Sequence, residues 1–268
     1  MVVVSLGDLV LDVVVRIDSE IARGADTPAR TSLSAGGQAA NVAAWASALG
    51  ASARWLGKRA ADAPGLLAAE ELERRGVELA GPVERAGNGV IVSLVERGGE
   101  RSMFPDRGVA TRLEPAELRA EWLACDHLHV SGYALLAEPV RRAAARAVEL
   151  AREAGATVSV DLSSWSTIRD AGAARFRSQV EALGPDVVFA NEDEQDVFGD
   201  PLPGVAWILK RGSRGCSFDG DERAAIDVPD VVDTTGAGDA LAAGWILGGP
   251  DLALETAARC VQRAGSMP

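Results

Sequence analysis

A glycine-rich turn followed by a helix-forming run decides how this sequence is interpreted: Val231-Val-Asp-Thr-Thr-Gly-Ala-Gly-Asp-Ala-Leu-Ala-Ala-Gly-Trp245. We expect a short strand to end before Thr234 and a helix to begin near Asp239. Small residues let the backbone amides of residues 236–238 converge on one point. The amino terminus of the helix adds unpaired N–H groups and a partial positive charge there. The segment therefore predicts an anion cradle made of backbone.

Asp239 is expected in the first turn of that helix, where it has two interpretations. An isolated aspartate at this position is most simply a carboxylate that the helix dipole stabilises. Beside an anion cradle, the same carboxylate can act as a base toward an alcohol that attacks a phosphoryl group. The complete string from Asp233 to Asp239 is much more specific than its Gly-Ala-Gly-Asp core.

The string Asp-Thr-Thr-Gly-Ala-Gly-Asp (233–239) resembles the C-terminal signature of the ribokinase-like (PfkB) family of carbohydrate and nucleoside kinases. A second motif lies far upstream, where Gly36-Gly37-Gln-Ala-Ala-Asn41 is similar to the family's N-terminal GG-x-x-x-N signature. Three further segments are similar to the family: 7–12, 191–194 and 210–215. Because the two motifs follow the family's order, the sequence is identified as a member over nearly its whole length.

The resemblance implies an ATP-dependent phosphotransferase that phosphorylates a hydroxyl group of a small sugar or sugar derivative. The implied catalytic set contains the base and the anion hole: Asp239, Gly236, Ala237 and Gly238. The implied substrate-binding set is Asp12, Gly36, Gly37, Asn41, Arg107 and Asp239. The implied nucleotide-binding set is Asn191, Lys210, Gly212, Ser213, Gly215 and Gly238. The implied metal set is Glu194, for Mg²⁺ through water, with Asp233 and Thr235 for a monovalent cation; use of K⁺ stays open.

Plainer interpretations stay open for several of these residues. Gly36-Gly37 is also consistent with a turn before a helix, and Asp12 with a solvated strand end. The acidic residues of segment 191–194 could simply cap a helix, and segment 210–215 could be a basic hairpin turn. Arg107 is equally consistent with a surface arginine.

The implied mechanism is in-line attack by a substrate hydroxyl on the γ-phosphate of ATP. Asp239 would accept the hydroxyl proton, while the amides of residues 236–238 and Mg²⁺ absorb the phosphate charge. An aspartate with the reference pKa of ~3.9 is a weak base for an alcohol. We therefore expect a late proton transfer, in which orientation matters more than basicity.

Short β-branched runs alternate with longer Ala/Leu/Arg/Glu stretches of helical period along the chain. The expected strands are 2–6, 53–56, 127–130, 157–161, 187–190 and 205–209. The expected helices are 38–49, 64–75, 139–153, 171–183, 240–247 and 252–264. This alternation predicts the α/β class with parallel βαβ units. With the resemblance, it predicts one ribokinase-like three-layer α/β/α domain over residues 1–268, with a mostly parallel central sheet.

Two stretches depart from this alternation of strands and helices, namely residues 12–17 and 89–104. In both, apolar and polar residues alternate, and the second contains a Gly98-Gly99 turn. Such alternation is typical of an antiparallel sheet with one wet face. We expect a small antiparallel β lid, inserted as segments of about 12–32 and 88–108. An edge hairpin of the main sheet is the alternative. A half-wet lid could pair across two subunits, so we also expect a homodimer through the lid.

The composition excludes several classes of partner. With 27 Lys+Arg against 39 Asp+Glu, the formal net charge of −12 argues against nucleic acid and anionic membrane surfaces. A small phosphorylated ligand needs only a local site and is not excluded. Three scattered cysteines, no basic leader and no apolar run near the ~20 residues of a spanning helix predict a soluble cytoplasmic protein. Cys125-x-His127-x-His129 lacks a further ligand pattern, so we expect a structural role for it.

The acceptor stays open within the implied class. A nucleoside is the alternative to a sugar, although the low aromatic content of 4% slightly disfavours a base-stacking pocket. A non-catalytic sugar- or nucleotide-binding regulator is a second alternative, against which the intact Gly-Ala-Gly-Asp turn argues. Segment 195–204 is shorter than the corresponding stretch of the family, so a helix is expected to be missing and the adenine contacts are in doubt.

Overall fold

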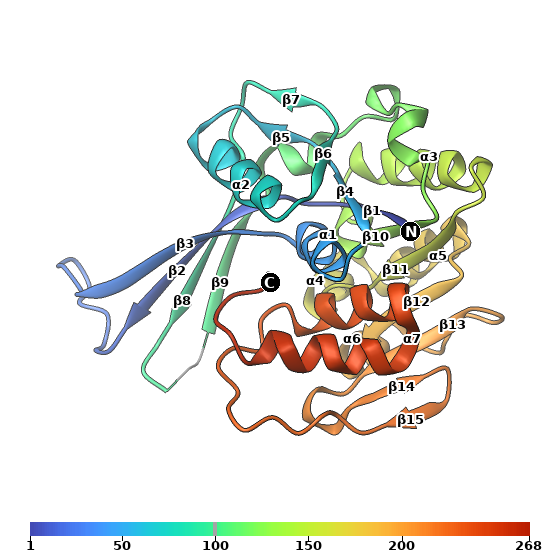
Figure 1. Ribbon diagram of the computed structural model, residues 1–268. Coiled ribbons are helices and arrows are strands. Elements are labelled where there is room, and N and C mark those ends of the chain that lie inside the picture. The colour runs from blue at the N-terminus through green and yellow to red at the C-terminus, as the bar shows by residue number, and fades with distance from the viewer. Residues whose placement is uncertain (99–100) are drawn as a thin grey trace.

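A nine-stranded sheet forms the middle layer of the protein, whose computed structural model describes residues 1–98 and 101–268 (Figure 1). Its order is β15 (Asp221–Arg223), β14 (Cys216–Phe218), β13 (Ala206–Lys210), β12 (Val187–Asn191), β11 (Thr157–Asp161), β10 (His127–Ser131), β1 (Val2–Leu6), β4 (Ser52–Leu56) and β6 (Glu78–Ala80). All neighbours are parallel except β13–β14 and β14–β15. The parallel strands therefore end at one edge, where ligands of such sheets collect.

Helices cover both faces of this sheet (Figure 1). One face packs against α1 (Gln38–Ala48), α2 (Ala63–Arg74) and α7 (Ala237–Val261). The other packs against α3 (Val140–Glu153), α4 (Trp165–Ala171), α5 (Ala173–Leu183) and α6 (Glu192–Phe198). The predicted three-layer α/β/α fold is confirmed, and apolar residues from both helix layers and from alternate strand positions fill the two cores.

Short elements complete the chain. The 3₁₀ turns are η1 (Gly108–Arg112), η2 (Pro115–Glu117), η3 (Ala120–Leu123), η4 (Gly132–Leu135) and η5 (Gly212–Arg214). β5 (Arg59–Ala60) and β7 (Val83–Glu84) form a separate two-stranded pair.

A second sheet of four strands, here called the small sheet, projects from one side of the main domain (left in Figure 1). Its order is β3 (Ala29–Gly36), β2 (Val10–Ile17), β8 (Gly89–Val95) and β9 (Arg101–Asp106). The pairs β2–β3 and β8–β9 are antiparallel, and a parallel pair, β2–β8, joins them. Gly98 has a φ of +109°, and Gly99 of the predicted turn lies outside the described residues.

The structure corrects several predicted boundaries near glycine and proline. The helix expected over 171–183 begins two residues later as α5, because Gly172 (φ +92°) separates it from α4, a preceding helix that was not predicted. The two helices expected after Asp239 are confirmed as the two halves of α7, because Gly249 (φ +74°) has a non-helical conformation before Pro250 and divides the element at a kink. The strand expected before Thr234 is wrong, because no strand covers the residues between β15 and α7.

Segment 195–204 contains the end of the short helix α6, which runs directly from the end of β12, and then a loop that leads toward β13. Within residues 1–98 and 101–268, none of the helices combines the length and the apolar character that a membrane span requires.

Candidate active site

The glycine-rich turn lies at the amino terminus of α7, as its sequence predicts. Gly236 is the residue before the helix and has a φ of +80°, which favours glycine. A Cβ atom on Gly236 would lie 2.6 Å from the carbonyl oxygen of Ser266, so the turn packs directly against the C-terminal segment. The Ala237 N–H donates to the Thr234 carbonyl oxygen at 3.3 Å, whereas the next amides of the first turn point out of the start of α7, where they can face an anion, and Asp239 lies in the same turn.

The half-buried Asp239 carboxylate is held by a residue of the other glycine motif. Asn41 Nδ2 in α1 donates a 2.7 Å hydrogen bond to Asp239 Oδ2, although 198 positions separate the two residues. Asn41 Oδ1 in turn accepts a hydrogen bond of 2.9 Å from Ser266 Oγ. The two motifs thus meet in one hydrogen-bonded chain at the start of α7.

Asp239 does not have the ordinary pKa that we expected of it. Burial and the nearby Asp161 carboxylate raise its pKa to about 7, against the opposing effects of the Asn41 hydrogen bond and Lys210. The carboxylate is consequently a much stronger base than an exposed aspartate, and the prediction of a reference pKa is wrong.

Lys210, the last residue of β13, brings a positive charge to the same place. Its Nζ atom lies 2.7 Å from Asp161 Oδ2 and 3.3 Å from the position of a Cβ on Gly238. The ammonium group therefore lies at the edge of the anion cradle. Asp161 and Glu194 outweigh the effect of burial and raise the pKa of Lys210 above its ordinary value.

A cavity of about 620 Å³ begins at the cradle and extends between α7 and the loop that precedes it. Its polar end is lined by Lys210, Gly212, Ser213, Gly215 and Gly238. Its apolar part is lined by Ile226, Val228, Val231, Leu254, Ala257 and Val261. A cavity with an anion cradle at one end and an apolar slot at the other can accommodate a phosphorylated, flat, hydrophobic ligand.

The profile of the pfkB family carbohydrate kinases matches residues 2–267, which is nearly the whole chain. The chain belongs to the pfkB family. It is 34% identical over 280 residues to an ATP-dependent ribose-1-phosphate kinase of Halopiger xanaduensis, covering 96% of this chain and 90% of that protein. It is 32% identical to fructokinase-1 of Oryza sativa subsp. japonica, covering 89% and 80%.

The solved structures agree on the fold of this pfkB protein. The adenosine kinase of Sinorhizobium meliloti superposes with a TM-score of 0.86 over 99% of this chain and 95% of that one, at 22% identity. Such low identity supports the ribokinase-like fold alone. Family membership makes the protein an ATP-dependent sugar kinase.

The residues predicted to hold Mg²⁺ in this pfkB kinase form a capping box at the start of α6. Glu194 Oε2 accepts the Asn191 backbone N–H at 2.8 Å, and Glu194 Oε1 accepts Asn191 Nδ2 at 2.9 Å. Asn191 Oδ1 accepts the Glu194 N–H at 2.8 Å. Burial raises the pKa of Glu194, which Lys210 partly opposes. Both carboxylate oxygens are thus engaged within one helical turn.

Asp233 and Thr235, predicted for a monovalent cation, are likewise engaged with protein donors. Asp233 Oδ1 accepts the Thr235 backbone N–H at 2.9 Å and the Thr235 hydroxyl at 2.6 Å. Asp233 Oδ2 accepts the Gly265 N–H at 3.2 Å. Despite partial burial, these bonds lower the pKa of Asp233.

The predicted acceptor residues lie where the small sheet meets α1. A Cβ on Gly36 would lie 2.1 Å from Asp12 Oδ2, so this glycine makes room for the Asp12 carboxylate. Burial raises the pKa of Asp12 to about 6, an effect that Arg101 opposes and Glu71 reinforces. Gly37 begins α1 with a φ of +103°, and a Cβ there would lie 2.4 Å from the carbonyl oxygen of Asp8.

Arg107 is neither a free surface arginine nor a free substrate ligand. Its Nε donates to Asp8 Oδ2 at 2.7 Å, and its guanidinium lies 4.7 Å from the centre of the Tyr133 ring. Burial raises the pKa of Asp8, which Arg107 opposes. The pair anchors the end of β9 to the main domain.

Arg101, Asp161 and the apolar end of the cavity were not predicted from the sequence, each for a different reason. Arg101 donates a hydrogen bond from β9 to the Thr235 hydroxyl, a contact that depends on how the small sheet sits over α7. Asp161 ends a correctly predicted strand, and an acid at a strand's carboxyl end was an available signal. The apolar slot has no local sequence signature.

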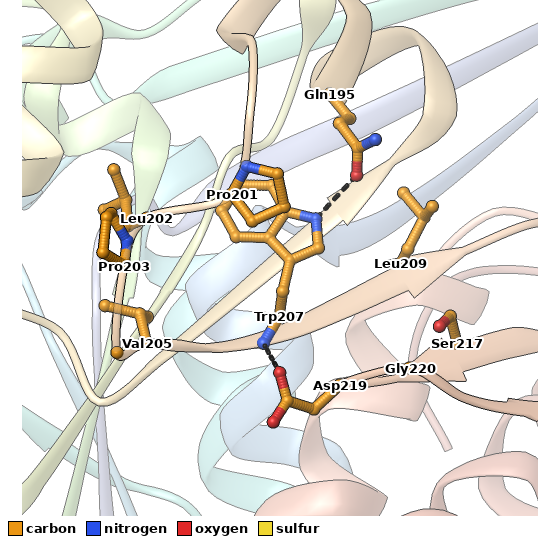
Figure 2. Close-up of a pocket in the computed structure, with 11 residues that line it drawn as sticks. Gln195, Pro201, Leu202, Pro203, Val205, Trp207, Leu209, Ser217, Asp219 and Gly220 are labelled. Atoms are coloured by element: carbon orange, nitrogen blue, oxygen red, sulfur yellow. Dashed lines mark hydrogen bonds between the residues drawn. The ribbon is translucent and has the colours of Figure 1, made fainter.

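A second hollow, of about 460 Å³, lies apart from this site (Figure 2). Segment 201–205 and α6 surround Trp207 there, and Trp207 Nε1 donates to Gln195 Oε1 at 2.8 Å. Trp207 and Leu209 face the core of α6, whereas Ile208 faces the core of α7. The hollow is therefore on the other face of the main sheet from α7, and it contains none of the predicted site residues.

Proposed function

We propose that this kinase transfers the γ-phosphoryl group of ATP to a hydroxyl of a small sugar or sugar derivative, with Asp239 as base and the amides of residues 236–238 as anion hole. The observation that carries the proposal is the position of the Asp239 carboxylate. It lies in the first turn of α7, is oriented by Asn41, and is accompanied by the Lys210 ammonium. A base, an anion cradle and a cation thus converge where charge develops in phosphoryl transfer.

ATP fits the cavity with its phosphates toward α7 and its adenine in the apolar slot. Lys210 and the amides near Gly212, Ser213 and Gly215 line the phosphate end. The slot is built by the loop before α7 and by the second half of α7, not by segment 195–204. The shortness of that segment therefore leaves an adenine site intact.

Asn191 and Glu194 fit Mg²⁺ that is held through water. Both Glu194 oxygens are already engaged, and no cluster of three acidic, histidine or cysteine side chains suited to a metal occurs in the part of the chain that is described. Mg²⁺, when bound, would neutralise charge on the ATP phosphates. Mg²⁺ held through water needs no direct carboxylate ligand, whereas K⁺ at Asp233 would need direct contact with oxygens that already accept N–H or O–H groups, so no step is assigned to a monovalent cation.

The acceptor would lie between Asp239 and the small sheet, which we propose is the lid. Asp12 would contact acceptor hydroxyls, with Gly36, Gly37 and Asn41 as the floor. The register places Arg16 and Arg101 in one row on the face of Asp12, on either side of Val95. Two arginines there favour an acceptor with an anionic substituent. Ribose 1-phosphate, the substrate named for the 34% identical relative, is the first candidate; fructose and adenosine follow from other relatives.

An ADP-release assay with Mg-ATP tests the proposal against ribose 1-phosphate, ribose, fructose and adenosine. We expect the highest kcat/KM with ribose 1-phosphate. Adenosine as the best acceptor would make the protein a nucleoside kinase. No ADP release with any acceptor in the panel, and no thermal shift with ATP, would favour the non-catalytic regulator.

The activity should depend on pH through Asp239. A base must be deprotonated to accept a proton, so kcat/KM should be low below pH 7, rise through a midpoint near the Asp239 pKa of about 7, and level off above it. Initial rates between pH 5 and pH 9 at constant ionic strength measure this limb. A midpoint near 4 would mean that Asp239 titrates as an ordinary aspartate or is not the base.

The outer face of the small sheet suits a second copy of this chain. Leu33, Val13, Val92 and Phe104 are consecutive register partners on the face opposite Asp12, and Leu33 and Phe104 are each 58% exposed. An apolar row of this kind marks an interaction surface. We propose a homodimer that pairs these faces.

Leu33→Arg should therefore convert a dimer to a monomer, because it places a charge in the apolar row. Light scattering after gel filtration measures the mass. Leu66→Arg on α2, where the leucine is 57% exposed, is the matched control and should stay dimeric. A monomeric parent protein, or a dimer that survives Leu33→Arg, would contradict the interface.

The cytoplasm is the compartment that we propose. All three cysteines are buried and unpaired, which suits a reducing environment. The net charge of −12 continues to argue against nucleic acid and anionic membranes as partners.

A further inference from the structure

Asp161 is a buried carboxylate at the centre of the site to which the proposed reaction gives no part. It is the last residue of β11, and its side chain is 1% exposed. Oδ2 accepts Lys210 Nζ at 2.7 Å, and Oδ1 accepts the backbone N–H of Ser163 at 3.1 Å. Ser163 has a φ of +78°, unusual for a residue other than glycine. Both oxygens of Asp161 therefore have fixed partners.

The Lys210 ammonium has its position because of this carboxylate. A lysine side chain has four flexible bonds, and a charge at its end needs a partner to stay in one place when it is buried. Asp161 is the group within hydrogen-bonding distance of Nζ, and Nζ lies beside Gly238 at the anion cradle. The ion pair thus fixes a positive charge where the phosphates of ATP would lie.

Asp161 also acts on Asp239 by its charge. Side chains from six elements around Asp239 interact with it. They are Asn41 (α1), Lys210 (β13), Glu194 (α6), Tyr133 (η4), Cys260 (α7) and Asp161 (β11). Of the charged groups, Asp161 has the largest effect, and it raises the pKa of Asp239. A negative charge nearby makes a carboxylate hold a proton more strongly.

We propose that Asp161 is a positioning residue of phosphoryl transfer, which holds the Lys210 ammonium at the anion cradle and keeps its own negative charge near Asp239. The proposal rests on the proposed function, since it assumes that Lys210 meets ATP and that Asp239 is the base. No proton moves to or from Asp161 in this scheme. Its contribution is the position of two charges, its own and that of Lys210.

Asp161→Asn tests both parts, since asparagine has nearly the same shape without the charge. We expect the KM for ATP to rise about tenfold, because Lys210 loses the partner that orients it. We also expect the acidic limb of the kcat/KM profile to move to lower pH, because Asp239 becomes a weaker base. A purely structural role would lower the rate equally at every pH and leave the midpoint in place.

Lys210→Met and the double variant Asp161→Asn/Lys210→Met complete a double-mutant cycle, which measures whether the two residues act on ATP together. If Asp161 acts on ATP through Lys210, the double variant should have the same KM for ATP as Lys210→Met alone. Multiplied effects of the two substitutions would overturn the proposal. The double variant leaves no charge buried without a partner, so it should fold even if a single variant does not.

Asp186→Asn is the matched control. Asp186 pairs with Arg152 at 2.7 Å beside the first residues of β11 and β12, at the far edge of the main sheet. It should change neither the KM for ATP nor the midpoint of the pH profile. The proposal is also overturned if Asp161→Asn behaves like Asp186→Asn.

Direct ATP binding, measured by calorimetry without acceptor, separates failure of this inference from failure of the proposed function. If Asp239 is not the base, Asp239→Asn will retain activity, whereas Asp161→Asn will still weaken ATP binding about tenfold through Lys210. If Asp239 is the base and Asp161→Asn leaves both ATP binding and the pH midpoint unchanged, the role assigned to Asp161 is wrong.

Discussion

Asp239→Asn should lower kcat by about 10³-fold while ATP still binds with an affinity near that of the parent protein, because general-base catalysis contributes about 10²–10⁴-fold. Asparagine can still accept the hydrogen bond from Asn41 Nδ2, so the start of α7 should keep its geometry. What is lost is the group that takes the proton of the attacking hydroxyl. Single-turnover rates at pH 8 and calorimetric titration with ATP measure the two halves of this expectation.

Asp251→Asn provides the comparison within the same helix. Asp251 lies in α7 with its side chain 85% exposed and pairs with Arg223. Its loss should leave kcat unchanged. Near-normal turnover of Asp239→Asn would remove Asp239 from the role of base, whatever happens to ATP binding.

Gly236→Ala should lower both stability and rate. A Cβ there would lie 2.6 Å from the Ser266 carbonyl oxygen, and the residue has a φ of +80°. Left-handed strain and overpacking together should cost about 2–4 kcal/mol of unfolding free energy. A displaced Ser266 would also disturb the hydrogen bond that it donates to Asn41, so kcat should fall about 10²-fold through misplaced anion-hole amides.

Gly249→Ala separates conformational strain from packing. Gly249 lies in the same helix with a φ of +74°, but nothing lies within 4 Å of a Cβ placed there. It should lose about 1–3 kcal/mol of unfolding free energy by backbone strain alone and keep its kcat. Thermal unfolding and initial rates of the two variants are the measurements. Equal behaviour of both would show that the packing of Gly236 against Ser266 does not shape the anion hole.

Local patterns in the sequence were sufficient to predict the main sheet and its helices. Runs such as Val2–Leu6 and Thr157–Asp161 became strands with the expected bounds, because buried parallel strands are short and β-branched. The turn at Gly236 could also be predicted from the sequence, because glycines just before a helix usually serve to form a tight turn. The errors lay at Gly172, where a helix boundary was misplaced, and before Thr234, where the expected strand is absent.

The candidate site was harder to predict from the sequence, because it depends on contacts between distant segments. The resemblance named Asn41 and Asp239, but only the packing of α1 against α7 shows that one orients the other. The basicity of Asp239 follows from burial beside Asp161, which no local pattern expresses. Arg101 faces Thr235 because of the register of β9 on β8, which the alternation of residues left undetermined.

The parallel pairing of β2 with β8 has a consequence for the order in which the protein folds. The antiparallel hairpin of β2 and β3 is made from adjacent residues and can form early, whereas β8 must return across α1, β4 and α2 to reach it. During synthesis, the edge of β2 that later pairs with β8 is therefore unpaired, and this strand contains three consecutive valines, Val13, Val14 and Val15. Such an edge is a template for pairing with other chains. The small sheet is thus a late-folding unit, and the nascent chain is most prone to aggregate before β8 is synthesised.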